Sequence, residues 1–193
     1  MFNGCSNITN TWEELINNRE ELTNIGECAF KSCSGIKGEL VIPNGISTLN
    51  TSIFQECTGI ERLVIPENVT QLGGNVFLNC TGIKYLKIPI SINSYNNKFP
   101  GVTNIEEIYF SKGTGVGFSL ANWQASGGLC YQSREKLTKV TLEDGITRIG
   151  DYTFYGCSNI SEVYYTGSSE NWNLITKGAG NESITKLEVQ CDS

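Results

Sequence analysis

The sequence predicts a solenoid, a coil of short repeats whose strands stack into one parallel sheet. Three consecutive blocks resemble one another, at residues 22–45, 46–68 and 69–91, and a fourth clear copy follows at residues 146–166. Each block spans about 23 residues and repeats its apolar positions at the same offsets, which is typical of solenoids. A single block is too small to bury its own apolar face, so we expect each block to pack against its neighbours.

The spacing within one block predicts about seven short parallel strands. Between Ile60 and Ile65 the apolar residues follow the pattern L-x-x-L-x-L, and Pro66 ends the strand because proline lacks the N–H that a central strand needs. The first block has an extra residue near its strand, and Gly38 is the expected position of a bulge. We expect a right-handed α/β or mainly β coil. The same template, applied to the rest of the chain, gives strands near residues 40, 85–88, 107–110, 139–142, 162–165 and 186–189.

Most cysteines in this chain are predicted to be core residues. A Phe three residues before a Cys recurs once per block. Stacking of the coils should therefore align the Phe side chains in one file and the Cys side chains in another, with about 4.8 Å between equivalent positions of neighbouring coils. Cysteine is small and apolar, so we expect free, buried thiols beside backbone carbonyls. Three cysteines fall outside this pattern, and a disulfide among them is an alternative. The pattern pairs are Phe2/Cys5, Phe30/Cys33, Phe54/Cys57, Phe77/Cys80 and Phe154/Cys157, and the exceptions are Cys28, Cys130 and Cys191.

Two segments resemble the BspA-type leucine-rich repeat family. Residues 25–33 (IGECAFKSC) and 149–157 (IGDYTFYGC) match that family's I-G-x-x-A-F-x-x-C pattern, and residues 163–167, 171–172 and 187–189 are similar to its usual closing repeat. The resemblance implies a leucine-rich-repeat solenoid. It also implies a surface-exposed or secreted binding protein, often an adhesin that acts on host or matrix proteins, and it carries over no catalytic residues.

The whole chain is predicted to form a single leucine-rich-repeat domain. Residues 1–21 form an N-terminal cap or partial repeat, residues 22–91 regular repeats, residues 92–136 an irregular repeat with an insert, and residues 137–193 the C-terminal repeats and cap. The first residues match the middle of a later repeat, which predicts either an excised piece of a longer protein or a degenerate first repeat. Thr11 and Glu14 fit a capping box before a short helix at residues 12–20, whose Trp12 should be core. Trp172 should cover the C-terminal end in the same way.

Composition and motifs argue against several classes of function. The chain has 14 basic and 20 acidic residues, and a formal charge of −6 disfavours nucleic-acid binding. It has no apolar run long enough to insert into a membrane and no visible signal peptide. Without histidine a Cys–His pair cannot exist, and the cysteine spacing does not fit a metal site. The glycines in residues 113–117 do not fit a nucleotide loop, so we predict no cofactor and no enzymatic activity. The Asn-x-Ser/Thr sequences at Asn7, Asn68, Asn79, Asn159 and Asn181 are interpreted as by-products of the repeat.

The candidate binding surface is the concave face of the predicted sheet. Residues that flank each inward apolar residue should point outward, and tyrosine and arginine are common in binding hot spots. Loops on a rigid scaffold often carry recognition, so the insert at residues 111–136 is a second candidate. We therefore expect a protein partner, and the alternative is a structural spacer that binds nothing. The candidate residues are Arg62, Tyr85, Lys87, Glu107, Tyr109, Lys139, Glu162 and Tyr164 on the sheet, and Trp123 and Tyr131 in the insert.

Overall fold

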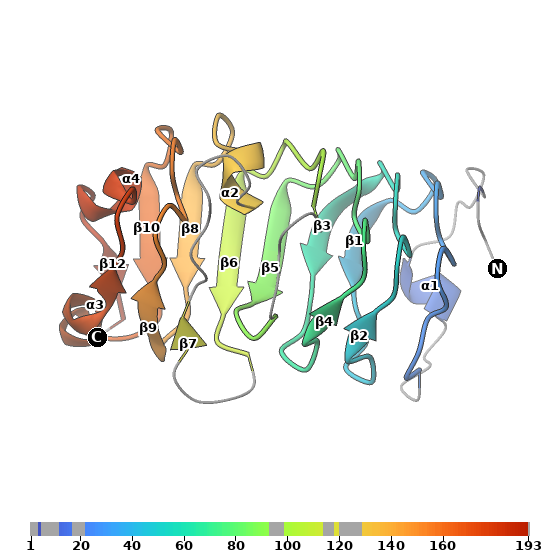
Figure 1. Cartoon of the computed structure of the whole chain (residues 1–193), viewed down its shortest axis with the longest axis horizontal. Coiled ribbons are helices and arrows are strands. Elements are labelled where there is room, and N and C mark those ends of the chain that lie inside the picture. The colour runs from blue at the N-terminus through green and yellow to red at the C-terminus, as the bar shows by residue number, and fades with distance from the viewer. Residues whose placement is uncertain are drawn as a thin grey trace.

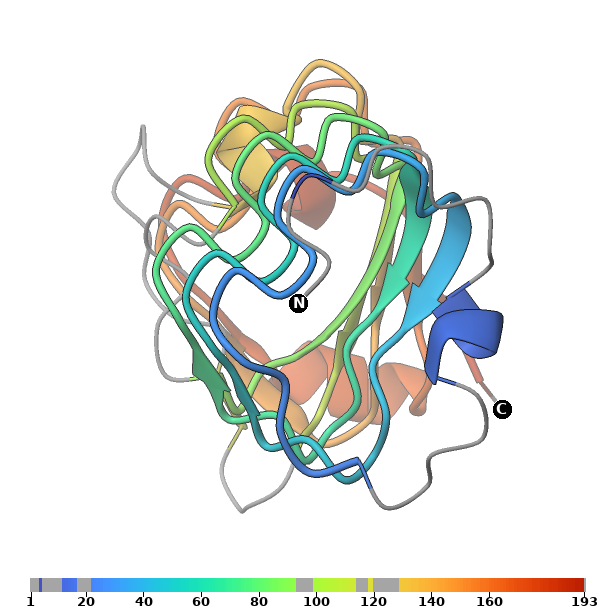
Figure 2. The ribbon, with the colours of Figure 1, turned by 90° about the vertical axis from the view of Figure 1, so that its right-hand side faces the viewer.

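The chain coils into a solenoid whose strands stand side by side in chain order (Figure 1). The computed structural model describes residues 4, 12–16, 22–92, 99–113, 118–119 and 129–192. Helices are few and short within this part of the chain, so of the two expected coil types the mainly β coil is the correct one. Figure 2 looks along the solenoid and shows the successive coils lying one behind another.

One seven-stranded parallel sheet forms a whole side of the solenoid, as predicted. Its order follows the chain, so each strand pairs only with those of the preceding and following coils. The outer face and the core face alternate along each strand, because successive side chains of a strand point to opposite sides. The strands are β1 (Gly38–Val41), β3 (Ile60–Val64), β5 (Tyr85–Pro89), β6 (Glu107–Ser111), β8 (Lys139–Leu142), β10 (Glu162–Tyr165) and β12 (Gln190–Cys191).

The predicted irregularity at Gly38 is confirmed. The register between β1 and β3 shifts between Gly38 and Glu39, so that Gly38 pairs with Ile60 and Glu39 with Arg62. Gly38 has a φ of 74°, a left-handed conformation that glycine adopts without a Cβ clash. After this step the pairing of β1 with β3 is regular, which keeps the inward residues of both strands on the core face.

A second side of the coil carries shorter strands. β2 (Thr48–Leu49) pairs with β4 (Gln71–Leu72) directly before Gly73. Farther along the chain β7 (Phe118–Ser119), β9 (Ile146–Ile149) and β11 (Thr176–Lys177) form a three-stranded parallel sheet. The core therefore lies between the long sheet and this second side (Figure 2).

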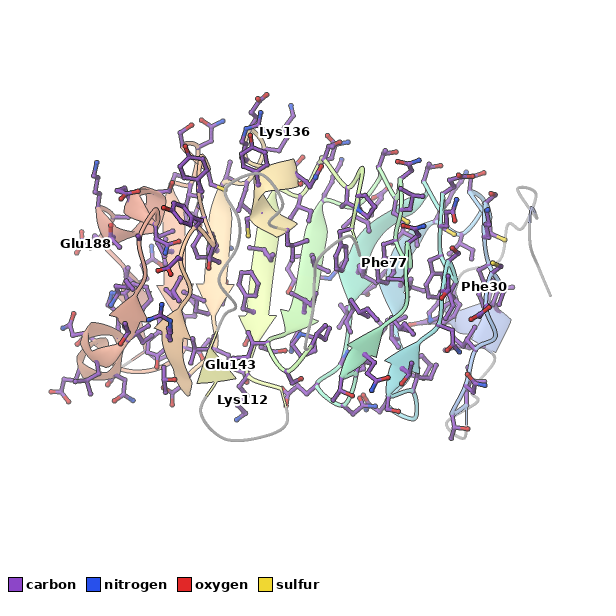
Figure 3. All side chains as sticks on the ribbon, viewed as in Figure 1. Phe30, Phe77, Lys112, Lys136, Glu143 and Glu188 are labelled. Carbon is purple, nitrogen blue, oxygen red and sulfur yellow. The ribbon has the colours of Figure 1, made fainter. Side chains whose placement is uncertain are left out.

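Stacked phenylalanine rings run through the core. Phe30, Phe54 and Phe77 follow one another with ring centroids 5.7 and 5.8 Å apart and planes within 7° of parallel. Phe99 extends the file at 5.2 Å from Phe77. Figure 3 labels two of these rings, Phe30 and Phe77, which lie on either side of the coil of Phe54. The predicted file is therefore confirmed, and it continues into the segment that the sequence marked as irregular.

The cysteine file is also confirmed. Cys57 and Cys80 are fully buried, and each thiol donates to the backbone oxygen of the phenylalanine one coil earlier, Phe30 and Phe54, at 2.9 Å. The Cys157 thiol makes the equivalent contact with the backbone oxygen of Cys130 at 3.6 Å. All described cysteines are free, those outside the Phe–Cys pattern included. Cys5 lies outside the described residues.

One cysteine assignment needs correction. Cys130 was expected to lie in an irregular insert, yet it is buried in the core and stands where other coils place phenylalanine. Ser133, three residues later, takes the place of the usual cysteine, and its hydroxyl donates to the backbone oxygen of Val102 at 3.0 Å. The coil is therefore regular in shape, although Cys130 and Ser133 replace the phenylalanine and the cysteine of the other coils. α2 (Leu129–Gln132) belongs to this coil.

Short helices lie at both ends of the solenoid (Figure 1). α1 (Trp12–Ile16) places Trp12 in the core, where its ring meets Phe30 and Phe54 edge-on and its Nε1 donates to the backbone oxygen of Val41 at 2.7 Å. Thr11 and residues 17–20 of the predicted cap lie outside the described residues. At the other end α3 (Ser169–Leu174) buries Trp172 beside Tyr165, as expected of a cap.

The last predicted strand is placed wrongly. Residues 186–189 are not a strand, because α4 (Glu182–Thr185) precedes them and Lys186 caps that helix. The chain joins the sheet only at β12, where Gln190 pairs with Tyr164. Ile184 is buried in the core, but it lies on the helical turn α4 and not on a strand.

Candidate functional site

The outward side chains of the long sheet form two continuous rows, which we call the sheet face. Parallel pairing without a shift beyond Glu39 brings each outward residue beside its counterpart in the next strand. The eight candidate sheet residues all belong to these rows. The first row is Glu39, Arg62, Tyr85, Glu107, Lys139 and Glu162, and the second is Val41, Val64, Lys87, Tyr109, Thr141, Tyr164 and Gln190.

Opposite charges and an aromatic ring hold the first row together. Arg62 Nε lies 2.9 Å from Glu39 Oε1, and the Arg62 guanidinium carbon lies 3.4 Å from the centroid of the Tyr85 ring. Lys139 Nζ lies 3.9 Å from a Glu107 carboxylate oxygen and 4.0 Å from one of Glu162. Exposed pairs of this kind contribute only about 0.2–1 kcal/mol each. They nevertheless favour defined side-chain positions, so a partner meets a row in which each cation already lies beside a carboxylate.

The second row is less charged and more aromatic. Lys87 Nζ lies 4.8 Å from the centroid of the Tyr109 ring. Burial, reinforced by the Glu143 carboxylate, raises the pKa of Tyr109 to about 12, so its phenol stays protonated and can donate a hydrogen bond. Tyr164 donates to Asp192, and that hydrogen bond raises the pKa of Tyr164 above its ordinary value.

A depression of about 520 Å³ lies where β1, β3 and β5 end. Val41, Val64 and Lys87 contribute from the second row, and the rest comes from the turns that follow β1 and β3, namely Asn44, Pro66, Glu67 and Asn68. These turn residues are not among the binding residues predicted from the sequence, where Pro66 was interpreted only as the end of a strand. The one available signal was that the turns directly follow the outward positions of the sheet.

Tyr131, the insert candidate that the structure describes, does not join the sheet face. Tyr131 lies on α2, where its ring stacks on Tyr155 at 6.4 Å and the Arg134 guanidinium carbon lies 4.4 Å from its centroid. Tyr131 is therefore part of a small aromatic group on the turns, which also includes Tyr152. Trp123 lies outside the described residues.

The buried thiols are poorly suited to chemistry. Burial raises the pKa of Cys80 and of Cys157 to about 12, and it also raises the pKa values of Cys57 and Cys130. A thiol that stays protonated at neutral pH is a weak nucleophile and a weak metal ligand. Within the described ranges no three Cys, Asp or Glu residues converge as a metal site would require, and no helix there is long and apolar enough to cross a bilayer.

Comparison with known proteins identifies the repeat. The family model described as the BspA type leucine-rich repeat region matches residues 1–117 and 122–187, with six copies. No curated protein matches the chain significantly.

Two solved structures are similar in fold. One is a leucine-rich cell surface protein from Faecalibacterium prausnitzii A2-165, with 16% identity and a TM-score of 0.37, covering 81% of this chain and 48% of that one. The other is a leucine-rich repeat protein from Bacteroides ovatus ATCC 8483, with 18% identity and a TM-score of 0.41, covering 98% of this chain and 64% of that one. The chain thus spans about half the length of the first structure and 64% of the second. Since the family model accounts for nearly the whole sequence, the chain belongs to the BspA-type leucine-rich repeat family.

Proposed function

We propose that this chain is a non-catalytic binding module that recognises another protein through its sheet face. The observation that carries this proposal is the alignment of the outward residues into two continuous rows on a rigid sheet. Tyr85, Tyr109 and Tyr164 lie within those rows and offer ring surface at a low entropic cost of ordering. BspA-type repeats further suggest a surface or secreted microbial protein, and host or extracellular-matrix proteins as the class of partner.

The paired charges and the half-buried tyrosines of the sheet face support the proposal of a binding module. The charges of its first row are paired with one another, so binding does not have to reorganise them. The tyrosines of the sheet face are half-buried, and such rings can bury more area on contact while their positions are already fixed. The high pKa values of the core thiols of Cys80 and Cys157 support a non-catalytic role for this file, since these thiols stay protonated and are weak nucleophiles.

A triple substitution of Tyr85, Tyr109 and Tyr164 to Ser tests the proposal. We expect the variant to fold and to lose at least tenfold in affinity for a captured host or matrix protein, measured by biolayer interferometry, because aromatic hot spots contribute about 2 kcal/mol or more each. The matched control replaces Tyr152 and Tyr155, which are exposed on the turns, with Ser. Unchanged capture by the folded triple variant would reject the sheet face as the binding surface, whereas no capture by the unmodified chain would support the alternative, a structural spacer with no ligand of its own.

A further inference from the structure

The depression beside β1, β3 and β5 is the apolar part of an otherwise polar sheet face. Val41 is 40% exposed, and Val64 and Pro66 are half-buried, so apolar surface is open to solvent there. The corresponding positions of later strands in the second row are Lys87, Tyr109, Thr141 and Tyr164. The apolar patch is therefore confined to the first two strands of the sheet.

The rim of the depression carries two charges of opposite sign that lack ion-pair partners within the described part of the chain. Lys87 is the sheet-face cation without a carboxylate within 4 Å, whereas Arg62 and Lys139 both have one. Its ammonium lies 4.8 Å from the centroid of the neutral Tyr109 ring. Glu67 lies on the turn side of the depression, and its carboxylate likewise takes part in no ion pair described here.

The turn that forms one wall is fixed in place. The Asn68 side-chain amide donates to the backbone oxygen of Asn44 at 2.5 Å and to that of Ile46 at 2.8 Å. Both acceptors lie in the preceding coil, so the walls from two neighbouring coils are tied together. A depression with fixed walls needs little ordering when a ligand group enters it, which favours binding of a small rigid group.

We propose that this depression accepts one apolar side chain of a protein partner, flanked by an acidic residue that faces Lys87 and a basic residue that faces Glu67. The inference rests on the proposed binding function and names the chemistry of the partner at this point. An apolar side chain covers Val41 and Val64, while the two flanking charges supply the partners that Lys87 and Glu67 lack. Lys87 lies on β5 and Glu67 on the turn after β3, so the two opposite charges also set the direction in which a peptide segment lies across the depression.

Short peptides test the proposal directly. The probes are acetylated, amidated tripeptides with a central leucine: Glu-Leu-Lys, Lys-Leu-Glu and the uncharged Gln-Leu-Gln. Each is titrated up to about 10 mM, the range in which weak single-site contacts are measurable, while the methyl resonances of Val41 and Val64 are followed by NMR. We expect one of the two mixed-charge peptides to bind about threefold to fivefold more tightly than the uncharged peptide at low salt. That difference should shrink as added salt screens the charges.

The decisive variant exchanges the two rim charges, as Lys87→Glu with Glu67→Lys. Both residues are on the surface, so the exchange leaves the core intact, and we expect it to reverse which mixed-charge peptide binds better. Equal binding of all three peptides, an order preference that survives the exchange, or no shift of the two valine resonances would each overturn the proposal. The Tyr85, Tyr109 and Tyr164 triple substitution still measures partner capture independently, so failure here and failure of the proposed function are distinguishable.

Discussion

Asn181 gives the last regular coil the hydrogen bonds that a following coil provides elsewhere. In earlier coils the phenylalanine N–H donates to a backbone oxygen of the next coil, as from Phe30 to Ile53 at 2.9 Å. At the C-terminal end the N–H of Phe154 donates instead to Asn181 Oδ1 at 3.0 Å, and Asn181 Nδ2 donates to the backbone oxygens of Gly150 and Gly178. Only 2% of this side chain is exposed. One buried amide therefore completes the polar pairing at this end of the solenoid.

Replacing Asn181 with Ala should be costly. It leaves the N–H of Phe154 buried without a partner, and an unsatisfied buried group costs about 1–3 kcal/mol. It also removes the hydrogen bonds to the backbone oxygens of Gly178 and Gly150, of which Gly150 keeps the Thr153 hydroxyl as a donor. We expect the free energy of unfolding in urea to fall by about 3 kcal/mol. Asn173→Ala is the control, because Asn173 is exposed in the same cap and its change should stay within about 0.5 kcal/mol. Equal effects of the two substitutions would show that the amide is dispensable.

The asparagine sequences illustrate what residue types alone can reveal. Asn68, Asn159 and Asn181 each donate through the side-chain amide to a backbone oxygen of a neighbouring coil, which agrees with their interpretation as part of the repeat. Their positions were visible in the sequence because they recur with the repeat. Their hydrogen-bond partners were not, because those depend on the distance between coils, which no single sequence position encodes.

Each strand is preceded by a position that controls how closely two coils approach. In the early coils this position is Gly59 or Gly82, and a Cβ on Gly82 would meet the backbone oxygens of Thr58 and Ile60. In later coils it is Asn104 or Asn159, whose side-chain amide donates to a backbone oxygen of the preceding coil at 2.8 Å. The solenoid thus joins neighbouring coils either by close backbone contact or by a side-chain hydrogen bond.

A Gly82→Ala substitution tests the first arrangement. The added methyl group meets backbone atoms that cannot move aside without shifting β3, and overpacking of this kind costs about 1–3 kcal/mol. We expect thermal denaturation to show a loss of about 2 kcal/mol. In Gly26→Ala the new Cβ has no atom within 4 Å, so this variant should be neutral or slightly stabilised. If Gly82→Ala proves as stable as Gly26→Ala, close backbone packing is not what requires glycine.

The coils were predictable from the sequence where the repeat keeps its phenylalanine and its cysteine, and were not where it lacks them. Alternation and turn signals located most strands and both rows of the sheet face, because period-two patterning fixes which side chains point outward. The coil around Cys130 was missed because Cys and Ser replace the usual Phe and Cys. The depression was also missed, because its walls come from turns whose path after Pro66 depends on contacts between coils.

At the scale of the whole molecule, the solenoid has one continuous core and two ends that need covering. The buried apolar residues form a single cluster from Trp12 to Ile184. Each coil nevertheless contacts mainly its two neighbours, so stability is expected to follow a nearest-neighbour scheme in which damage at one end spreads only a short way. Trp12 is well placed to test this, since its ring packs edge-on against both Phe30 and Phe54 in the N-terminal part of the described core.

Trp12→Ala should loosen the N-terminal coils selectively. The substitution removes the ring contacts with Phe30 and Phe54 and the hydrogen bond to Val41, and loss of a buried Trp costs about 3–5 kcal/mol. In native-state hydrogen exchange we expect the amide of Ile42, which follows β1 and donates to the backbone oxygen of Val64, to exchange about 100-fold faster. The amide of Glu143, which follows β8 and donates to the backbone oxygen of Phe110, should exchange less than about tenfold faster. Trp12→Phe, which keeps an aromatic ring but loses the Nε1 donor, should have an intermediate effect. Equal acceleration at both positions would mean that the solenoid unfolds as one unit, and the nearest-neighbour description would then be wrong.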